Sequence, residues 1–320
     1  MLKTIGKRIV QSIITLFLVV TFTFILTRMI PGDPAQTMLG PQADVASIEK
    51  LRIELGLDKS IGEQYLMYMK DVLQGDFGKS YLHNKDVMQI IIERIPNTLV
   101  LTLTSMVIAL VIGSLAGMAS AIKQYSAIDY IATVLALVGV SVPIFWMGLM
   151  LVRLFSVNLG WLPATGMGSM DKGLWDVISH MILPCFCLAT VPMATFTRIT
   201  RSSMLEVINS DYIRSLRVRG LKEKVVIWKH ALKNALPPIV TVLGLQLAAA
   251  FTGAILTESI FSWPGMGTMI VTAINNRDYA LIQGFVLFVA IVYVVINLLV
   301  DIVYTLINPR VTLDGGSGGN

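Results

Sequence analysis

The residue types that could carry chemistry are scattered through this sequence. The three histidines, His83, His180 and His230, fall in separate regions, and no Ser/His/Asp or paired-carboxylate arrangement is found around them. Cys185 and Cys187 lie in an apolar run with no His or carboxylate at ligand spacing, which favours packing over a metal pair. The sequence therefore predicts a chain that is not an enzyme and has no catalytic, cofactor-binding or metal site.

One stretch of the sequence resembles part of a nucleotide-binding motif. The segment GDFGKS at 75–80 ends like a phosphate-binding loop, whose glycine-rich backbone cradles phosphates. That motif needs a glycine five residues before its Gly-Lys pair, and this position is Leu73. No strand is predicted before the segment. If ATP drives this protein, ATP and Mg²⁺ are bound by another chain.

The elements that must position these residues are apolar helices. Of the 320 residues, 55% are hydrophobic and 14% are charged, whereas a soluble domain carries about 25% charged residues. Several apolar runs exceed about 18 residues, the length that indicates a membrane span. The sequence predicts an all-α polytopic membrane protein with six transmembrane helices, at about 9–30, 97–122, 128–157, 178–199, 238–261 and 280–307.

The charges predict the orientation of these spans. Lys and Arg gather before the first span, between the second and third, between the fourth and fifth, and after the sixth. The loop 31–96 has more acids than bases. Because basic loops stay in the cytoplasm, both termini are expected there and the loop 31–96 is expected outside.

Three segments are expected along the chain. Residues 1–96 hold the first span and an extracytoplasmic loop, in which two stretches with helical spacing predict two short helices. Residues 97–310 form a five-helix transmembrane core. Residues 311–320 are a tail, of which 315–320 resemble an appended Gly/Ser linker.

The loop between the fourth and fifth spans, about 201–236, is basic and far longer than a turn. A short helix should end at Gly220, and a second amphipathic segment should run to the prolines after Leu236, where the fifth span begins. Apolar residues recur among the basic ones, namely Ile213, Leu216, Val218 and Leu221. This pattern predicts a rigid two-helix elbow suited to a protein groove. On charge alone, a topology signal at an anionic lipid surface is the simpler interpretation.

Distinctive motifs follow one another along the chain: RMIPGDP at 28–34, ELGLD at 54–58, GDFGKS at 75–80, SVPIFWMG at 141–148, GWLPATG at 160–166, ITRSSMLEVINSDYIRSLRVRGL at 199–221, ESIFSWPGMG at 258–267 and INNRDYALIQG at 274–284. Up to about residue 311, the chain resembles the DppB/OppB-type permease subunits of the peptide/nickel branch of ATP-binding-cassette importers. That resemblance implies the type I importer permease fold.

The resemblance also implies a role for the elbow. Such permeases carry an EAA loop, a Glu-Ala-Ala triplet followed by Gly and later by Leu-Pro. Arg214, Ser215 and Leu216 stand at the triplet here, as is usual in the peptide/nickel branch. The implied helix at 213–222 inserts into a cytoplasmic ATPase and drives alternating access. The implied ATPase-coupling residues are Tyr212, Ile213, Arg214, Ser215, Leu216, Arg217, Gly220, Leu221, Leu236 and Pro237.

Within the spans, a few polar residues draw attention. The resemblance implies that Ser141 and Gln246 line the translocation path. Asp301 lies inside the sixth span, where an ionisable residue needs a partner, and a structural pairing is favoured over a transport role. Arg28 and Glu258 lie near span ends, where they can snorkel or cap.

The implied assembly contains a second, DppC/OppC-like permease subunit, two cytoplasmic ATPases and an extracytoplasmic solute-binding protein, in a bacterial cytoplasmic (inner) membrane. No cofactor on this chain and no nucleic-acid partner are expected. The implied cargo is a short peptide, closest to a dipeptide, with nickel, glutathione or another small solute left open. A self-sufficient secondary transporter or channel would show inverted repeats or an ion-binding constellation, and neither is seen. A membrane scaffold would leave the elbow unexplained.

Overall fold

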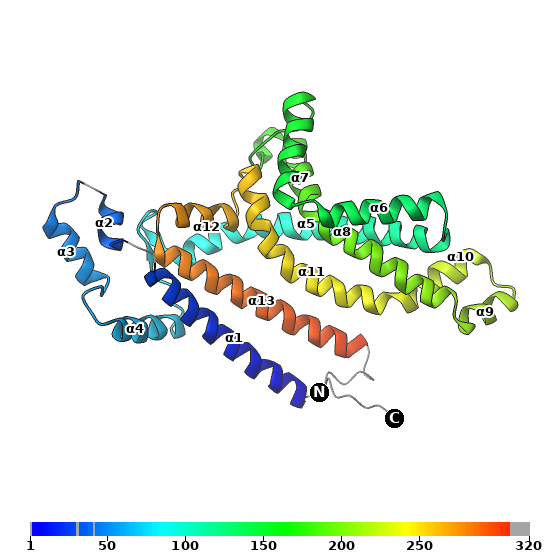
Figure 1. Ribbon diagram of the computed structural model, residues 1–320, viewed down its shortest axis with the longest axis horizontal. Coiled ribbons are helices and arrows are strands. Elements are labelled where there is room, and N and C mark those ends of the chain that lie inside the picture. Colours follow the sequence, from blue (N-terminus) through cyan, green and yellow to red (C-terminus); the bar gives the residue numbers. More distant parts are fainter. Residues whose placement is uncertain (1, 30–31, 41, 308–320) are drawn as a thin grey trace. The chain divides into compact units, whose positions relative to one another are not determined.

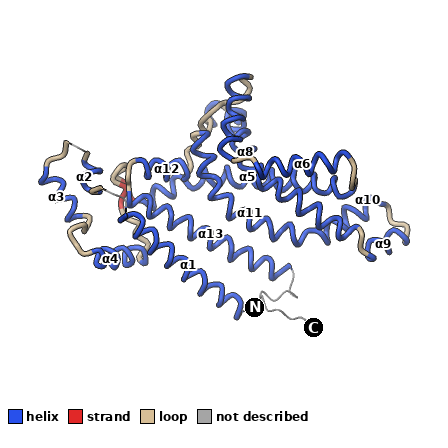
Figure 2. Tube along the Cα trace, in the orientation of Figure 1, coloured by secondary structure: helices blue, strands red, loops and turns tan. Residues whose placement is uncertain are grey.

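Helices make up nearly all of the computed structural model, which describes residues 2–29, 32–40 and 42–307 (Figures 1 and 2). Five helices of this part are long and apolar enough to cross a membrane, and six if one bent pair counts as a single span. The chain divides into two compact units, residues 1–98 with 264–295 and residues 99–263 with 296–320. Each unit is described by itself.

The first unit contains the N-terminal span and the loop that follows it. Its elements are α1 (Leu2–Met29), α2 (Pro34–Leu39), α3 (Val45–Glu54), α4 (Ile61–Leu73), β1 (Lys79–Ser80), β2 (Lys85–Asp86), the start of α5 (Val87–Ile122), α12 (Met266–Asn275) and the first part of α13 (Tyr279–Ile307). The two helices that the sequence predicts in the loop are present as α3 and α4.

Side-chain caps fix where these short helices begin. Asp33 and Asp44 cap α2 and α3, since their carboxylates accept backbone N–H groups of the first turn. Ser60 and Glu63 form a reciprocal capping box at the start of α4. Each cap satisfies N–H groups that a helix of so few turns cannot pair internally.

A small antiparallel hairpin fixes the end of the loop. In its register, Lys79 pairs with Asp86 and Ser80 with Lys85. The buried Asp278 carboxylate, just before α13, accepts hydrogen bonds from the Ser80 hydroxyl at 2.6 Å and from the Leu82 N–H at 3.3 Å. Short polar strands give no periodic signal, so the sequence does not predict this hairpin.

The second unit is a helix bundle built around α8 (Leu174–Ile208), which packs against α6 (Ala127–Ser141) and α11 (Leu232–Phe261). The remaining elements are the end of α5, α7 (Ile144–Leu151), a π-helical segment (Val152–Asn158), a 3₁₀ turn (Met170–Lys172), α9 (Asp211–Val218), α10 (Glu223–Val225), a π-helical turn (Val226–Ala231) and the end of α13.

The predicted third span is not one straight helix. It breaks between α6 and α7, and the two parts are bent by 105°. Pro143 has no N–H to give to the preceding turn and disfavours a helical residue before it, and Val142 is accordingly extended.

The predicted start of the fifth span at Pro237 is wrong. The helical path is continuous from Glu223 to Phe261, through α10, the π-helical turn and α11, with Pro237 and Pro238 inside α11. The π-helical turn packs Val226 and Ala231 into a buried cluster. Ala235 and Ile239, on either side of the two prolines, are also buried in the bundle, and their packing keeps the chain helical where the local sequence signals a break.

Two glycines allow α5 to approach α8 closely. A Cβ atom at Gly113 or Gly117 would overlap the carbonyl oxygens of Met193 and Thr197 respectively. Their spacing is that of a GxxxG helix-packing motif, in which small residues let two backbones meet.

We therefore expect Gly117→Val to lower the free energy of unfolding by about 1–3 kcal/mol or more, because α5 and α8 must separate. Thermal unfolding of the detergent-solubilised chain measures the loss. Gly6→Val in α1 is the control, since a Cβ at Gly6 has no neighbour within 4 Å. Equal melting temperatures for the two variants would contradict the close packing.

Candidate functional site

The elbow predicted from the sequence is formed by α9 and the chain that follows it. Ser210 precedes α9 in an extended conformation, and the helix ends in a Schellman motif. In that motif Gly220 N–H donates to the Arg217 carbonyl at 2.9 Å and Leu221 N–H donates to the Leu216 carbonyl at 3.3 Å. Gly220 has a φ of 79°, a conformation that glycine adopts without strain, so the predicted helix end is confirmed.

One face of α9 is buried in the bundle. Ile213 is 0% exposed and Leu216 is 8% exposed. They pack in a cluster with residues from α5, α8 and the π-helical turn, among them Met118, Met204 and Val226. The two apolar residues thus attach the elbow to helices of the second unit.

The opposite face of α9 is open. Tyr212, Arg214, Ser215 and Arg217 are exposed there, and Val218 is 84% exposed. The predicted coupling residues therefore fall into two groups, since Ile213 and Leu216 hold the elbow in place while the exposed residues can contact a partner. Val218 recurs as an apolar residue in the basic loop, but it was not among the predicted coupling residues.

Two side-chain contacts brace the elbow. The Tyr212 hydroxyl lies 2.9 Å from His230 Nδ1, which joins α9 to the π-helical turn. The Arg217 guanidinium donates to both Glu223 carboxylate oxygens, at 3.1 and 2.7 Å. His230 and Glu223 were not predicted as site residues, because the fold alone brings them opposite α9.

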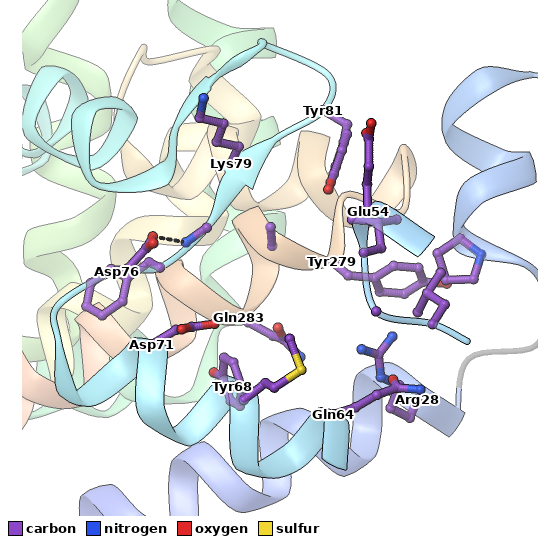
Figure 3. Close-up of a pocket in the computed structure, with 18 residues that line it drawn as sticks. Arg28, Glu54, Gln64, Tyr68, Asp71, Asp76, Lys79, Tyr81, Tyr279 and Gln283 are labelled. Carbon is purple, nitrogen blue, oxygen red and sulfur yellow. Dashed lines mark hydrogen bonds between the residues drawn. The ribbon is translucent and has the colours of Figure 1, made fainter. Parts of the chain in front are cut away.

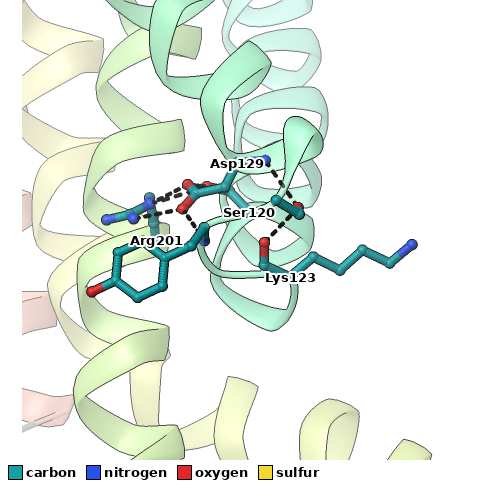
Figure 4. Close-up of polar contacts among 6 residues, drawn as sticks. Ser120, Lys123, Asp129 and Arg201 are labelled. Carbon is teal, nitrogen blue, oxygen red and sulfur yellow. Dashed lines mark hydrogen bonds and ion pairs between the residues drawn. The ribbon is translucent and has the colours of Figure 1, made fainter.

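A buried ion pair lies in the same unit, at the turn between α5 and α6 (Figure 4). Arg201 of α8 donates to the two carboxylate oxygens of Asp129 at 2.7 and 2.9 Å. Ser120 and the Tyr125 N–H also donate to that carboxylate. Asp129 is only 3% exposed, and its charge is held by this bidentate pair. Arg201 falls within the basic loop predicted at about 201–236, whereas in the structure it is a residue of α8 with a buried partner.

Other predicted residues lie elsewhere in the second unit. Leu236 is exposed and Pro237 is partly buried, both inside α11. Ser141 ends α6, and its hydroxyl donates to the Leu137 carbonyl at 2.8 Å, while Gln246 is half-buried in α11. Their part in a translocation path stays a prediction. Asp301 lies in α13, and its side chain is outside the described residues.

A bundle of membrane-spanning helices with a helical elbow braced against it defines a transport permease. The sequence matches the family of binding-protein-dependent transport system inner membrane components over residues 109–313. The N-terminal region of such membrane components matches over residues 1–102. The chain belongs to this family.

Curated relatives share the full length of the chain. It is 46% identical to the dipeptide transport system permease protein DppB of Alkalihalophilus pseudofirmus, over 97% of this chain and 99% of that protein. It is 41% identical to the protein of the same name from Escherichia coli K12, over 97% and 99%. The glutathione transport system permease protein GsiC of the same strain is 40% identical, over 97% and 99%. The resemblance to DppB/OppB-type permeases is confirmed.

A solved structure confirms the fold. The MetNI methionine transporter in an inward-facing conformation has a chain that aligns with a TM-score of 0.53 at 16% identity, covering 69% of this chain and 97% of that chain. The protein therefore has the type I importer permease fold in a multi-pass membrane chain.

The ion pair between Asp129 and Arg201 predicts an asymmetric response to substitution. Arg201→Gln leaves a buried carboxylate without its cation, which costs about 3 kcal/mol. Asp129→Asn keeps hydrogen bonding to Ser120, and the Arg201 side chain, 30% exposed, can reach water, so the cost is smaller. Thermal unfolding in detergent compares the two variants.

The exposed pair of Arg217 with Glu223 supplies the control. Arg217→Gln should change the melting temperature little, because exposed pairs contribute at most about 1 kcal/mol. Equal losses for Arg201→Gln and Arg217→Gln would show that Asp129 does not depend on its partner.

Proposed function

We propose that this chain is the permease subunit of an ATP-driven importer of dipeptides, forming half of the translocation path and receiving force through its elbow. Two observations support the proposal. The chain is similar over its length to dipeptide permeases, and α9 has one buried face and one open face. A helix that only marked topology at a lipid surface would not need a side chain as buried as Ile213.

In the proposed mechanism, closure of an ATPase pair displaces the open face of α9. The buried face passes this displacement to α5 and α8, because Ile213 and Leu216 pack against Met118 and Met204. The close contact at Gly117 holds those two helices together. The bundle then moves from inward-open to outward-open. This chain supplies no chemistry, since ATP and Mg²⁺ are held by the ATPase subunits.

The proposed assembly has a second, similar permease subunit, two cytoplasmic ATPases and an extracytoplasmic solute-binding protein. The family description, a binding-protein-dependent system, supports the last of these. In the proposed orientation, both termini and the elbow are cytoplasmic, which the distribution of basic residues supports.

A second candidate cargo is glutathione. The relative named as a glutathione permease is 40% identical, close to the 41% of the E. coli dipeptide permease. Both molecules are small peptides with free carboxylates, so the same type of path could pass either. Nickel is a further alternative cargo, because nickel importers share most of the sequence motifs of this chain.

Reconstitution tests the proposed function. The chain would be co-expressed with candidate ATPase, second-permease and binding-protein subunits, purified and placed in liposomes. We expect the subunits to co-elute and ATP hydrolysis to increase when the binding protein carrying dipeptide is added. We also expect ATP-dependent uptake of labelled L-alanyl-L-alanine that is greater than the uptake of labelled glutathione. Dipeptide flux through this chain alone would indicate a secondary transporter, and uptake of glutathione only would overturn the cargo assignment.

Gly220→Val tests the role of the elbow. A Cβ there has no neighbour within 4 Å, so the substitution strains the backbone at a φ of 79° without a steric clash. Strain of about 1–2 kcal/mol in a β-branched residue should displace the Schellman turn. We expect normal insertion, but loss of most ATPase co-purification and of dipeptide uptake.

Gly75→Val is the matched control. Gly75 has a φ of 78° and likewise has no neighbour within 4 Å of its Cβ position, so the local strain is the same. This variant should keep the ATPase subunits during purification. Retention of the ATPases by both variants would argue against docking at the elbow.

A further inference from the structure

A polar hollow of about 280 Å³ lies in the first unit (Figure 3). It is bounded by the end of α1, by α3 and α4, by the chain leading into the hairpin, and by the start of α13. None of its lining residues belongs to the elbow or to the predicted translocation path. The proposed function therefore does not explain it.

Three buried polar atoms in this hollow have no partner among the described residues. They are Arg28 Nε, Gln64 Oε1 and Tyr68 OH. Five such side-chain atoms are found in the described part of the chain, so three of the five gather at one site. A buried polar atom without a hydrogen bond costs about 1–3 kcal/mol, which makes the cluster unfavourable unless something occupies the hollow.

The charge of Arg28 indicates what that occupant must be. No carboxylate pairs with Arg28 among the described residues, and its guanidinium carbon lies 5.3 Å from the centre of the Phe24 ring. The Arg28 side chain is partly exposed, but its Nε atom is buried. Water can satisfy an N–H group, but it cannot neutralise a cation, whereas a carboxylate does both through the planar guanidinium.

The opposite end of the hollow is acidic. In Figure 3, Asp71 lies at the far end from Arg28, with Tyr68 and Gln283 between them. In the same view, Asp76 and Lys79 lie on the side of Asp71, whereas Glu54 lies on the side of Arg28. Burial raises the pKa of Tyr68 to about 12, so its hydroxyl stays protonated and can donate. Arg28 at one end and the Asp71 carboxylate at the other suit a molecule that carries both charges.

We propose that this hollow binds a small zwitterion of the amino-acid type, with its carboxylate on Arg28 and its ammonium group toward Asp71. The volume suits a free amino acid or a dipeptide rather than a larger ligand. The site is separate from the path that the family resemblance implies, and its existence does not depend on which cargo is carried.

Titration calorimetry of the full chain in lipid nanodiscs tests the proposal. L-alanine and L-alanyl-L-alanine are the two zwitterionic probes, and they distinguish a free amino acid from a dipeptide. Propionate and propylamine each carry one of the two charges. We expect saturable binding of at least one zwitterion, and at least about tenfold weaker binding of both single-charge probes.

Arg28→Gln should weaken zwitterion binding at least about tenfold, because a charged bidentate contact is lost. Arg52→Gln is the matched control in α3, since Arg52 pairs with Asp33 and Glu49 and does not line the hollow. Arg52→Gln should bind as the unchanged chain does. No saturable binding by the unchanged chain, or equal binding by Arg28→Gln, would overturn the proposal.

Tyr68→Phe separates a ligand site from a structural role. The hydroxyl has no partner in the free chain, so its removal should leave the melting temperature unchanged or raise it while weakening the binding of the zwitterion several-fold. A lower melting temperature with unchanged affinity would show that the hydroxyl serves the fold, and it would count against the site.

Discussion

The position of the elbow depends on the burial of one face of α9, a helix too short to be stable by itself. Eight residues form α9, fewer than an isolated helix needs to be stable in water. Ile213 and Leu216 make it stable by packing against α5, α8 and the π-helical turn. The same packing means that α9 cannot move without moving the helices beneath it. In the proposed function, this packing makes the open face of α9 a mechanical connection to the bundle.

Two contacts carry that connection into the bundle. The backbones of α5 and α8 meet at Gly113 and Gly117, where no side chain separates them. The ion pair of Asp129 with Arg201 then fixes the turn between α5 and α6 to α8. Rigid packing of this kind transmits a displacement, because a packed interior deforms little. The elbow, α5, α6 and α8 are therefore expected to move together. The bend at Pro143 changes the direction of α7, which still packs against α8 and α11.

The sequence predicts the features that depend on local composition. Apolar run length is enough to find the spans, and Gly220 is enough to find the end of α9. Features that depend on a distant partner are missed: Gly113 and Gly117 have meaning only once α8 lies opposite, and Asp129 looks like an ordinary acid in a first helical turn. Local rules also fail at Pro237, where tertiary packing keeps the helix continuous. The hollow near Arg28 draws on residues from α1 and α4 that no short motif connects.

The most direct test is the distance between the elbow and α8 in the working transporter. Spin labels would be placed at Lys224 of the elbow, which is not a predicted coupling residue, and at Arg198 of α8. Both are exposed, and the buried Cys185 and Cys187 would first be replaced by alanine. Pulsed electron paramagnetic resonance would compare the nucleotide-free and ATP-bound states. We expect one narrow distance distribution that is the same in the nucleotide-free and ATP-bound states, because the elbow and α8 move as one body. A distribution that broadens or shifts when ATP binds would contradict it.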